Sequence, residues 1–183
     1  MDKKTDMAAS AAQLFAREGL RGIGVDHIGA SVGASTRTLY KHFGSRDGLV
    51  MAALESRHTA FMAVLHRDDG EIGTVESLFD TLEQWSAEFG ASGCLLLRAG
   101  SEYRGANDDI VALVRRQKEV FFQEVARRVS HALGHDDPLL SSQIWILFEG
   151  ATAIASLDNT AVIGAARAAA AALMAHAGQR NET

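Results

Sequence analysis

Apolar residues near the N-terminus recur every three or four positions, the spacing of one face of an amphipathic helix. The pattern predicts three short helices, over about residues 5–17, 25–32 and 36–43. Gly19 and Gly33 follow the first two helices and suit helix ends, and Ser35 is a natural N-cap for the third. Leu39 and Phe43 share the buried side of the third helix, so the three helices are expected to close a small core.

Helical periodicity continues through the rest of the chain. A fourth helix is expected to begin near Arg46, after a cap at Ser45. Further helices are predicted at about residues 74–89, 92–103, 108–133, 138–157 and 161–177. Gly134 ends the longest of these, and Pro138, the only proline, suits the first turn of the next, with Asp136 or Asp137 as its cap. Long proline-free stretches rich in Ala, Leu, Glu, Gln and Arg favour helices over strands, so an all-α fold is predicted.

The exposed side of the third predicted helix is basic and polar. At about 100° per residue, Arg37 and Lys41 point away from Leu39, and Thr38 and Tyr40 flank them. Three short helices whose third presents such side chains form the arrangement that holds a recognition helix against a DNA major groove. The pattern therefore indicates a three-helix, helix-turn-helix DNA-binding region.

Charge is divided unevenly along the chain, which has a formal net charge of −5. Residues 1–66 contain eight Lys and Arg against six Asp and Glu, a net of +2. Residues 67–183 contain ten against seventeen, a net of −7, and the two values sum to −5. A mildly basic N-terminal part on an acidic body is expected if only the N-terminal part meets phosphates.

Other features of the composition exclude several classes of protein. The single cysteine, Cys94, rules out an intramolecular disulfide and a cysteine zinc cluster, and without an adjacent histidine or basic residue it is predicted to be structural. The N-terminus lacks the continuous apolar core of a signal peptide, and Arg167 and His176 interrupt the most apolar late stretch. A soluble cytoplasmic protein without a cofactor is expected.

Two motifs in the N-terminal part are more specific than its periodicity. LFAREG ends the first predicted helix, and TLYKHF forms the third after V-x-x-I, a turn glycine and a serine cap. The stretch containing them closely resembles the DNA-binding region of TetR-family regulators and covers about a quarter of the chain. The resemblance implies a helix-turn-helix DNA-binding domain at residues 1–48 and a helical effector-binding and dimerisation domain at residues 49–183.

The resemblance also implies which residues contact DNA. The matching positions lie in or beside the third helix: Ser35, Thr36, Arg37, Thr38, Tyr40, Lys41, His42 and Arg46. Arg37 and Lys41 resemble residues that reach base edges, because Arg and Lys pair well with guanine O6 and N7. Tyr40, His42 and Arg46 resemble phosphate contacts.

Three glycines depart from the family pattern. Gly24 stands where a Thr or Ser usually caps the second helix, and Gly44 replaces a common proline. Gly29 replaces a frequent alanine inside the second helix, where glycine costs about 1 kcal/mol of helix propensity. None of the three removes the recognition helix.

In the C-terminal part, the resemblance implies a homodimer and a pocket for a small organic effector. Aromatic side chains that could line such a pocket, or belong to the core, are Phe61, Trp85, Tyr103, Phe121, Phe122 and Trp145. The last two helices occupy the place where the family builds its dimer interface. The apolar stripe predicted for that interface consists of Ile144, Leu147, Phe148, Ala151 and Ile154.

Two patterns in the sequence have alternative catalytic or metal-binding interpretations. Residues 29–33 match the G-x-S-x-G nucleophile elbow around Ser31, but the strand and sheet that the elbow requires have no counterpart in this sequence. His131 and His135 have metal-ligand spacing on a helix, but Gly134 is expected to end that helix between them. Neither an enzyme nor a metal site is predicted.

The sequence therefore predicts a sequence-specific DNA-binding transcriptional regulator. Repression, relieved when a small effector binds, is the favoured mode of action, and activation through the same DNA contacts is the alternative. A helical small-molecule-binding or enzymatic protein with a non-specific N-terminal part is the alternative from another class. The intact TLYKHF motif argues against that last interpretation.

Overall fold

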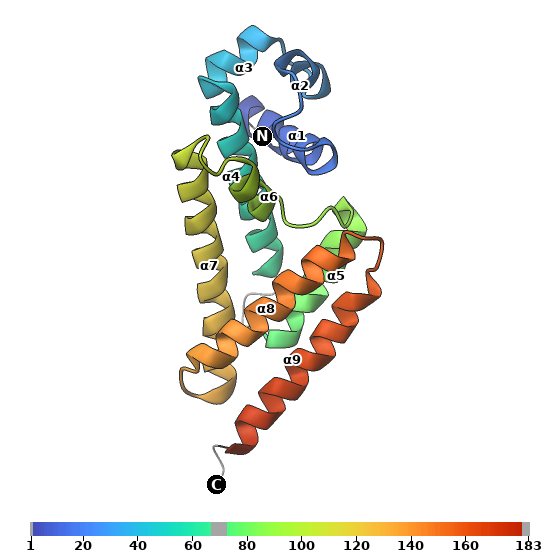
Figure 1. Cartoon of the computed structure of the whole chain (residues 1–183), viewed down its shortest axis with the longest axis vertical. Helices are drawn as coiled ribbons and strands as arrows, with labels where there is room; N and C mark the ends of the chain where they lie inside the picture. Colours follow the sequence, from blue (N-terminus) through green and yellow to red (C-terminus); the bar gives the residue numbers. More distant parts are fainter. Residues whose placement is uncertain (1, 67–72, 181–183) are drawn as a thin grey trace. The chain divides into compact units, whose positions relative to one another are not determined.

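The computed structural model describes residues 2–66 and 73–180, and all regular structure in these residues is α-helical (Figure 1). The helices are α1 Lys3–Glu18, α2 Val25–Ser31, α3 Thr36–Phe43, α4 Arg46–Leu65, α5 Val75–Phe89, α6 Leu95–Glu102, α7 Asp108–Leu133, α8 Pro138–Ala155 and α9 Ala161–Arg180. The all-α prediction is confirmed.

The helix ends follow the capping residues that the sequence indicates. Gly19 has a φ of 94° and its N–H donates to the Phe15 carbonyl at 3.0 Å, so it ends α1. Asp137 caps α8 through a hydrogen bond from Leu140 N, with Pro138 in the first turn. Gly134, at a φ of 77°, follows the last residue of α7. His131 therefore lies in α7 and His135 beyond its end.

The chain forms two compact units, which are described separately. Unit 1 contains residues 2–61 and 95–117, and unit 2 contains the described residues of 62–94 and 118–180. Helices α4 and α7 contribute residues to both units. Unit 1 therefore includes much of α4, all of α6 and the start of α7, a larger packing unit than the domain predicted at residues 1–48.

The core of unit 1 holds the three N-terminal helices together. Phe15 of α1, Ile28 of α2 and Leu39 of α3 are buried in one apolar cluster with Val50 of α4. Residues from α6, the turn that follows it and the start of α7 complete the cluster, and they include Leu95, Ala99, Tyr103, Ile110 and Leu113. Because Leu39 is buried in this core, it determines which side of α3 faces outward.

Gly29 fits the place where α2 meets the turn before α3. A Cβ built on Gly29 would lie 2.6 Å from the Ala34 carbonyl oxygen, closer than real Cβ contacts allow. Ala34 N also donates to the Gly29 carbonyl at 2.9 Å. The helix propensity that this glycine costs α2 therefore permits a close backbone approach inside the helix-turn-helix.

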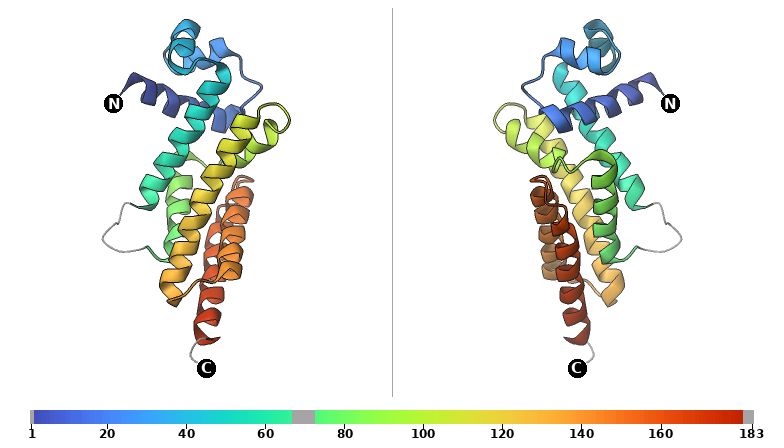
Figure 2. Two further views of the ribbon diagram at one scale, coloured as in Figure 1. Left: turned by 90° about the vertical axis from the view of Figure 1, so that its left-hand side faces the viewer. Right: turned by 90° about the vertical axis from the view of Figure 1, so that its right-hand side faces the viewer.

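Unit 2 is built from α5, α8, α9 and the C-terminal part of α7 (Figure 2). Helices α8 and α9 run side by side, and both pack against α5. Phe148 of α8 lies at the centre, with ring centroids 4.6 Å from Phe121 of α7 and 5.9 Å from Phe79 of α5. Ile163 and Ala170 bring α9 into the core.

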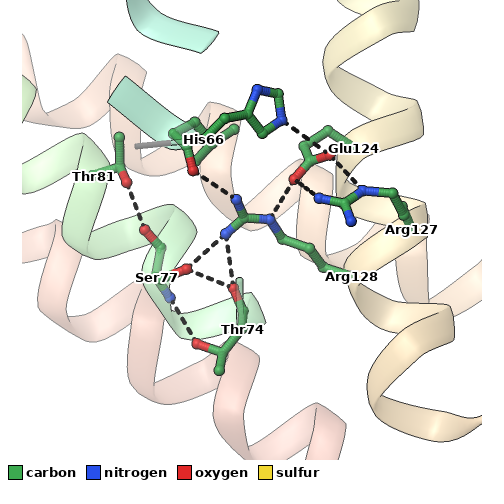
Figure 3. Close-up of polar contacts among 8 residues, drawn as sticks. His66, Thr74, Ser77, Thr81, Glu124, Arg127 and Arg128 are labelled. Atoms are coloured by element: carbon green, nitrogen blue, oxygen red, sulfur yellow. Dashed lines mark hydrogen bonds and ion pairs between the residues drawn. The ribbon is translucent and has the colours of Figure 1, made fainter. Parts of the chain in front are cut away.

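A buried arginine ties α7 to the end of α4 and the start of α5 (Figure 3). Arg128 is 2% exposed, and its Nε donates to Glu124 Oε1 at 2.6 Å. Its Nη1 donates to Ser77 Oγ at 2.6 Å and to the Thr74 carbonyl at 3.0 Å. Its Nη2 donates to the Leu65 carbonyl at 3.1 Å. These bonds satisfy most of the guanidinium donors, as a buried charge requires.

Glu124 is the carboxylate of this cluster. Arg127 donates to both of its oxygens at 2.8 Å, and His66 Nε2 lies 3.4 Å from Oε2. Burial alone would raise the pKa of Glu124, but the hydrogen bonds from Arg127 and Arg128 and the charge of Arg128 lower it from 4.5 to about 2. The carboxylate is therefore ionised at neutral pH.

Helix α9 is unusually rich in alanine. By length and composition alone, Ala161–Gln179 could cross a membrane, and it is the one helix in the described residues that passes this test. The same test is passed by core helices of soluble proteins. In unit 2 this helix packs on α5 and α8, and Arg167 forms an ion pair with Asp80 of α5.

Candidate functional site

Helix α3 is fixed in unit 1 at its N-terminus. Ser35 Oγ accepts a hydrogen bond from Thr38 N at 3.2 Å and lies 2.9 Å from Thr38 Oγ1, so both side chains are engaged in the cap. Thr36 Oγ1 donates to Asp26 Oδ1 at 2.7 Å, which links α3 to α2. Three of the predicted DNA-contact residues, Ser35, Thr36 and Thr38, therefore also orient the helix.

The outer face of α3 carries the other predicted contacts. Arg37 and Lys41 are exposed one helical turn apart, and Tyr40 between them is 44% exposed. In the part of the chain that the structure describes, these three side chains form no hydrogen bond or ion pair. Leu39, 2% exposed, lies on the opposite side of the helix. A cationic and aromatic face is thus presented on a rigidly seated helix.

His42 and Arg46 lie at the C-terminal end of this region. His42 is half-buried, with its ring centroid 6.3 Å from that of Phe43. The Arg46 guanidinium is bonded inside unit 1, to Tyr103 Oη and to the carbonyls of Leu20 and Ile23. The structure therefore places Arg46 in a different environment from Arg37 and Lys41.

The six aromatic residues predicted for an effector pocket are distributed over both units. Tyr103 belongs to the core of unit 1, and Phe61 also lies in unit 1. In unit 2, Phe122 and Trp145 pack together, with ring centroids 5.2 Å apart. Trp85 packs on Phe89 at 4.3 Å, and Phe121 packs on Phe148 in the unit core. Phe122 and Trp145 are the predicted pair that the structure brings together.

An ion pair beside Trp145 was not predicted from the sequence. Lys118 of α7 pairs with Glu149 Oε1 of α8, and Trp145 Nε1 donates to the same oxygen at 3.1 Å. Burial would lower the pKa of Lys118, but Cys94 and Glu149 outweigh it and raise that pKa. Within the described residues, Glu149 Oε2 is buried without a hydrogen-bond partner. Because Lys118 and Glu149 are 31 positions apart in sequence, no local motif signals the ion pair.

A groove of about 580 Å³ lies in unit 2, between the C-terminal part of α7 and the start of α8. Seven of its ten lining residues are of polar type, and the lining comprises Phe122, Gln123, Ala126, Arg127, Ser130, His131, Asp136, Asp137, Pro138 and Ser141. Phe122 is the one member of this lining that is also among the aromatic residues predicted for a pocket.

The apolar stripe predicted as a dimer interface faces mostly inward. Ile144 is 0% exposed, Phe148 5% and Ala151 2%, all within unit 2. Leu147 is half-buried, and Ile154 is 43% exposed. Those first three residues pack inside the protomer, so they are not available on its surface as the prediction requires. The prediction fails for these three residues because α8 is apolar on two sides. The periodicity alone does not show which of the two sides faces the core of unit 2 and which faces solvent.

The outer side of α8 carries a different apolar stripe. Leu139 is 71% exposed and Ile146 67%, and Leu157, two residues beyond the end of α8, is 72% exposed. Gly150 and Ala153 lie between them at alternating spacings of three and four residues. On α9, exposed alanines recur at the same spacings, at positions 161, 165, 168, 172 and 175. This spacing keeps side chains on one seam of a helix pair. We call these residues the α8–α9 seam.

Comparison with known proteins agrees with the geometry of unit 1. Residues 8–53 match the family described as bacterial regulatory proteins, tetR family. That range contains α2, α3 and the start of α4, with Arg37, Tyr40 and Lys41. No curated protein matches the chain.

Solved structures are similar over nearly the whole chain. A TetR-family transcriptional regulator from Streptomyces coelicolor has a TM-score of 0.82 at 21% identity, covering 96% of each chain. A candidate TetR transcriptional regulator from Streptomyces avermitilis has a TM-score of 0.77 at 26% identity, covering 97% of this chain and 98% of its own. A TetR transcriptional regulator from Chloroflexus aurantiacus has a TM-score of 0.77 at 19% identity, covering 95% of this chain and 93% of its own.

The sequence motifs and the family match agree over residues 8–53, which contain the helix-turn-helix. The similarity to solved structures extends this agreement in fold over nearly the whole chain. Residues 8–53 therefore match the tetR family of bacterial regulatory proteins, and the chain has the fold of TetR-family transcriptional regulators.

Proposed function

We propose that this chain is a cytoplasmic TetR-family regulator that binds a specific DNA operator through α3. It represses transcription until a small organic effector binds the protein and releases it from the operator. The observation that carries the proposal is the outer face of α3. Arg37, Tyr40 and Lys41 are exposed there, while Leu39 and the Ser35 cap hold the helix in one orientation. A rigid helix with exposed Arg and Lys can dock in a major groove with little free-energy cost for ordering its backbone.

The roles of the contacts follow from their chemistry. Arg37 and Lys41 reach base edges, where a guanidinium or ammonium pairs with guanine O6 and N7. Tyr40 and His42 bind the phosphate backbone and fix the register of the helix. Hydroxyl groups close to the same surface come from Ser35, Thr36 and Thr38. Each of these hydroxyls also forms a hydrogen bond within the protein. Specificity therefore rests mainly on Arg37 and Lys41.

A homodimer supplies the second recognition helix that a specific site requires. The α8–α9 seam supports this assembly, because Leu139, Ile146 and Leu157 are large apolar side chains in contact with solvent. The alanines of α9 let helices approach closely, so two copies of the pair can form a four-helix interface about a two-fold axis. The seam replaces Ile144, Phe148 and Ala151 as the proposed interface.

The proposed effector binds unit 2. Phe122 and Trp145 supply apolar wall, and the Lys118–Glu149 pair supplies a polar group beside it. This combination suits an amphipathic organic molecule better than a metal or a phosphate. Release follows if the effector favours a conformation of the dimer with lower operator affinity, and linkage then requires operator DNA to weaken effector binding equally.

The experiment that tests the proposal is a binding titration on the DNA upstream of the protein's own coding sequence. Fluorescence anisotropy is measured for this duplex and for a random duplex of equal length, at several salt concentrations. The proposal expects affinity for the upstream duplex to exceed random affinity by roughly 10³-fold or more. Equal affinity for both duplexes at every salt concentration would reject the proposal. The alternative of an N-terminal part that binds DNA without sequence preference would then be favoured.

A further inference from the structure

Arg46, at the first position of α4, is bonded to three oxygens of unit 1. Nη1 donates to Tyr103 Oη at 2.8 Å. Nη2 donates to the Leu20 carbonyl and, at 3.4 Å, to the Ile23 carbonyl. The side chain is 23% exposed, and the carboxylate of Asp47 lies 3.9 Å away. To reach a DNA phosphate, this guanidinium would have to leave these partners.

We propose that Arg46 is a positioning residue for the recognition helix and not a phosphate contact, and that Tyr103 is its partner in this role. The inference rests on the proposed DNA binding through α3. It assigns to the turn between α6 and α7, which lies far from the helix-turn-helix in sequence, an indirect part in operator recognition.

Arg46 connects the two ends of the helix-turn-helix. It follows α3 after only Gly44 and Ser45, so it lies close to the C-terminal end of that helix. Leu20 and Ile23 lie in the segment between α1 and α2, which has no regular structure of its own. A guanidinium that bonds both carbonyls fixes this segment against the start of α4. Because α2 is tied to α3 by the Thr36–Asp26 bond, the whole motif is then held.

Tyr103 provides the anchor on the other side of Arg46. It is 3% exposed and belongs to the core of unit 1. Burial raises the pKa of Tyr103 despite the nearby charge of Arg46, so the phenol remains protonated and Oη accepts the arginine N–H as a neutral partner. The Arg21 guanidinium lies over the Tyr103 ring, 5.7 Å from its centroid.

Three further hydrogen bonds hold the same turn against the N-terminal helices of unit 1. Asn107 Nδ2 donates to Asp47 Oδ2 at 2.8 Å, next to Arg46 in sequence. Arg21 donates from its backbone N to Glu102 Oε2 and from Nη1 to the Glu102 carbonyl, both at 3.1 Å. Tyr103 is therefore not an isolated partner, since the residues on each side of it in the chain are anchored as well.

The two roles of Arg46 predict different effects of mutation on DNA binding. A phosphate contact supplies one counterion-releasing charge, so its loss weakens binding to all sequences and flattens the salt dependence by about one unit of slope. A positioning residue supplies no such charge. Its loss misplaces α3, so specific affinity falls while random-sequence affinity and the salt slope stay close to those of the unmodified protein.

The test measures operator and random-duplex affinity across a salt series for the full-length protein and three variants. Arg46→Lys keeps the charge but cannot bond three oxygens in the fork geometry of a guanidinium. Tyr103→Phe removes one hydroxyl from a buried site. We expect both to lower operator affinity roughly 10- to 100-fold, the value of one or two charged hydrogen bonds, with an unchanged salt slope. Lys41→Ala is the control for a cation placed directly at the DNA: its loss should relax base preference and, because a charge leaves the interface, also flatten the slope.

Thermal unfolding of each variant shows whether unit 1 still folds, and Arg46→Lys and Tyr103→Phe are chosen because both keep the volume of the core. Full operator affinity in Arg46→Lys would overturn the inference, because a phosphate contact needs only the charge. Full affinity in Tyr103→Phe would overturn the role of Tyr103. If the unmodified protein shows no operator preference at all, the proposed function fails instead, and the two failures are distinguishable.

Discussion

Gly73 lies against the buried guanidinium of Arg128. A Cβ built on Gly73 would be 2.8 Å from Nη1 and 2.9 Å from Cζ of that arginine, and 3.0 Å from Ser77 Oγ. Because Arg128 bonds Glu124 and Ser77, it cannot move aside without breaking buried hydrogen bonds. Gly73→Ala is therefore expected to destabilise the protein by about 2 kcal/mol or more, measured as a lower midpoint of urea unfolding.

Gly178→Ala is the matched control for this substitution. A Cβ at Gly178 meets no atom within 4 Å, and the residue lies in α9, where alanine is the better helix former. Its unfolding midpoint is expected to equal or slightly exceed that of the unmodified protein. Equal midpoints for Gly73→Ala and Gly178→Ala would show that Arg128 is not held in place as described.

Glu124 makes the stability of unit 2 depend on acid pH. Its pKa is about 2 in the folded protein against 4.5 for the ordinary group, so the contribution is complete above pH 4.5 and is lost as pH falls toward 2. We expect a loss of about 2 kcal/mol over this range, after allowing for solvent near the half-exposed Arg127. Urea unfolding at fixed protein concentration between pH 3 and pH 7 measures it.

Glu124→Gln isolates the contribution of this carboxylate to the acid dependence of stability from that of the other carboxylates. The variant should be less stable at pH 7, because Arg128 keeps its buried charge without a counter-charge, and its stability should change less between pH 5 and pH 3. Glu119→Gln, at an exposed position of the same helix, should retain the acid dependence of the unmodified protein. A Glu124→Gln variant with an unaltered acid dependence would contradict the pKa of about 2.

Ile146 is the side chain that best tests the α8–α9 seam. It is 67% exposed in the protomer, so Ile146→Glu should leave the fold intact while placing a charge in the proposed interface. The variant is expected to sediment as a monomer at micromolar concentration and to bind operator at least tenfold more weakly, because one recognition helix is lost per complex. Val120→Glu, at a 51% exposed position of α7, should remain a dimer.

If the Ile146→Glu variant still sediments as a dimer, the α8–α9 seam is not the interface. The originally predicted residue Ile144 provides a contrast, since it is 0% exposed and its replacement by Glu is expected to unfold unit 2 instead of dissociating it. Circular dichroism at 222 nm distinguishes an unfolded variant from a folded monomer.

Local sequence signals were sufficient for the helix-turn-helix. The capping serine at Ser35, the turn glycine at Gly33 and the periodic Leu39 and Phe43 predict α3 over residues 36–43, which is where it lies. The family motifs occupy the same residues, so the periodicity and the resemblance give one answer. Helix ends marked by Gly19 and Gly134 were predictable for the same reason, because glycine relieves the strain of a positive φ.

Contacts between distant segments could not be read from the sequence. Arg46 resembles a phosphate contact locally, but its partner Tyr103 is 57 positions away in the chain. Lys118 and Glu149 are similarly separated, by 31 positions. In α8, apolar residues cover both the inner and the outer side of the helix, so a hydrophobic stripe did not show which side faces solvent. Which side of α8 is buried, and which distant residues meet, depends on how the neighbouring helices pack.

Trp145 should report effector binding, and Trp85 should not. Trp145 is half-buried beside Phe122 and bonded to Glu149, whereas Trp85 packs on Phe89 and is 9% exposed. For a compound that releases operator DNA, we expect quenching of tryptophan emission that is abolished in Trp145→Phe and retained in Trp85→Phe. Quenching that survives in Trp145→Phe at full amplitude would place the effector away from the Phe122–Trp145 pair.

If α3 reads a specific DNA sequence as part of a dimer, selection of binding sites from a random duplex library will recover that sequence. We expect the unmodified protein to enrich a site with two symmetric half-sites whose centres lie about one helical turn, or a small multiple of it, apart. Arg37→Ala should enrich the same site with preference relaxed at one base pair in each half, at a cost of about 1–3 kcal/mol. Enrichment of no sequence by the folded, dimeric protein, or an identical preference in Arg37→Ala, would contradict this sequence-specific reading by α3.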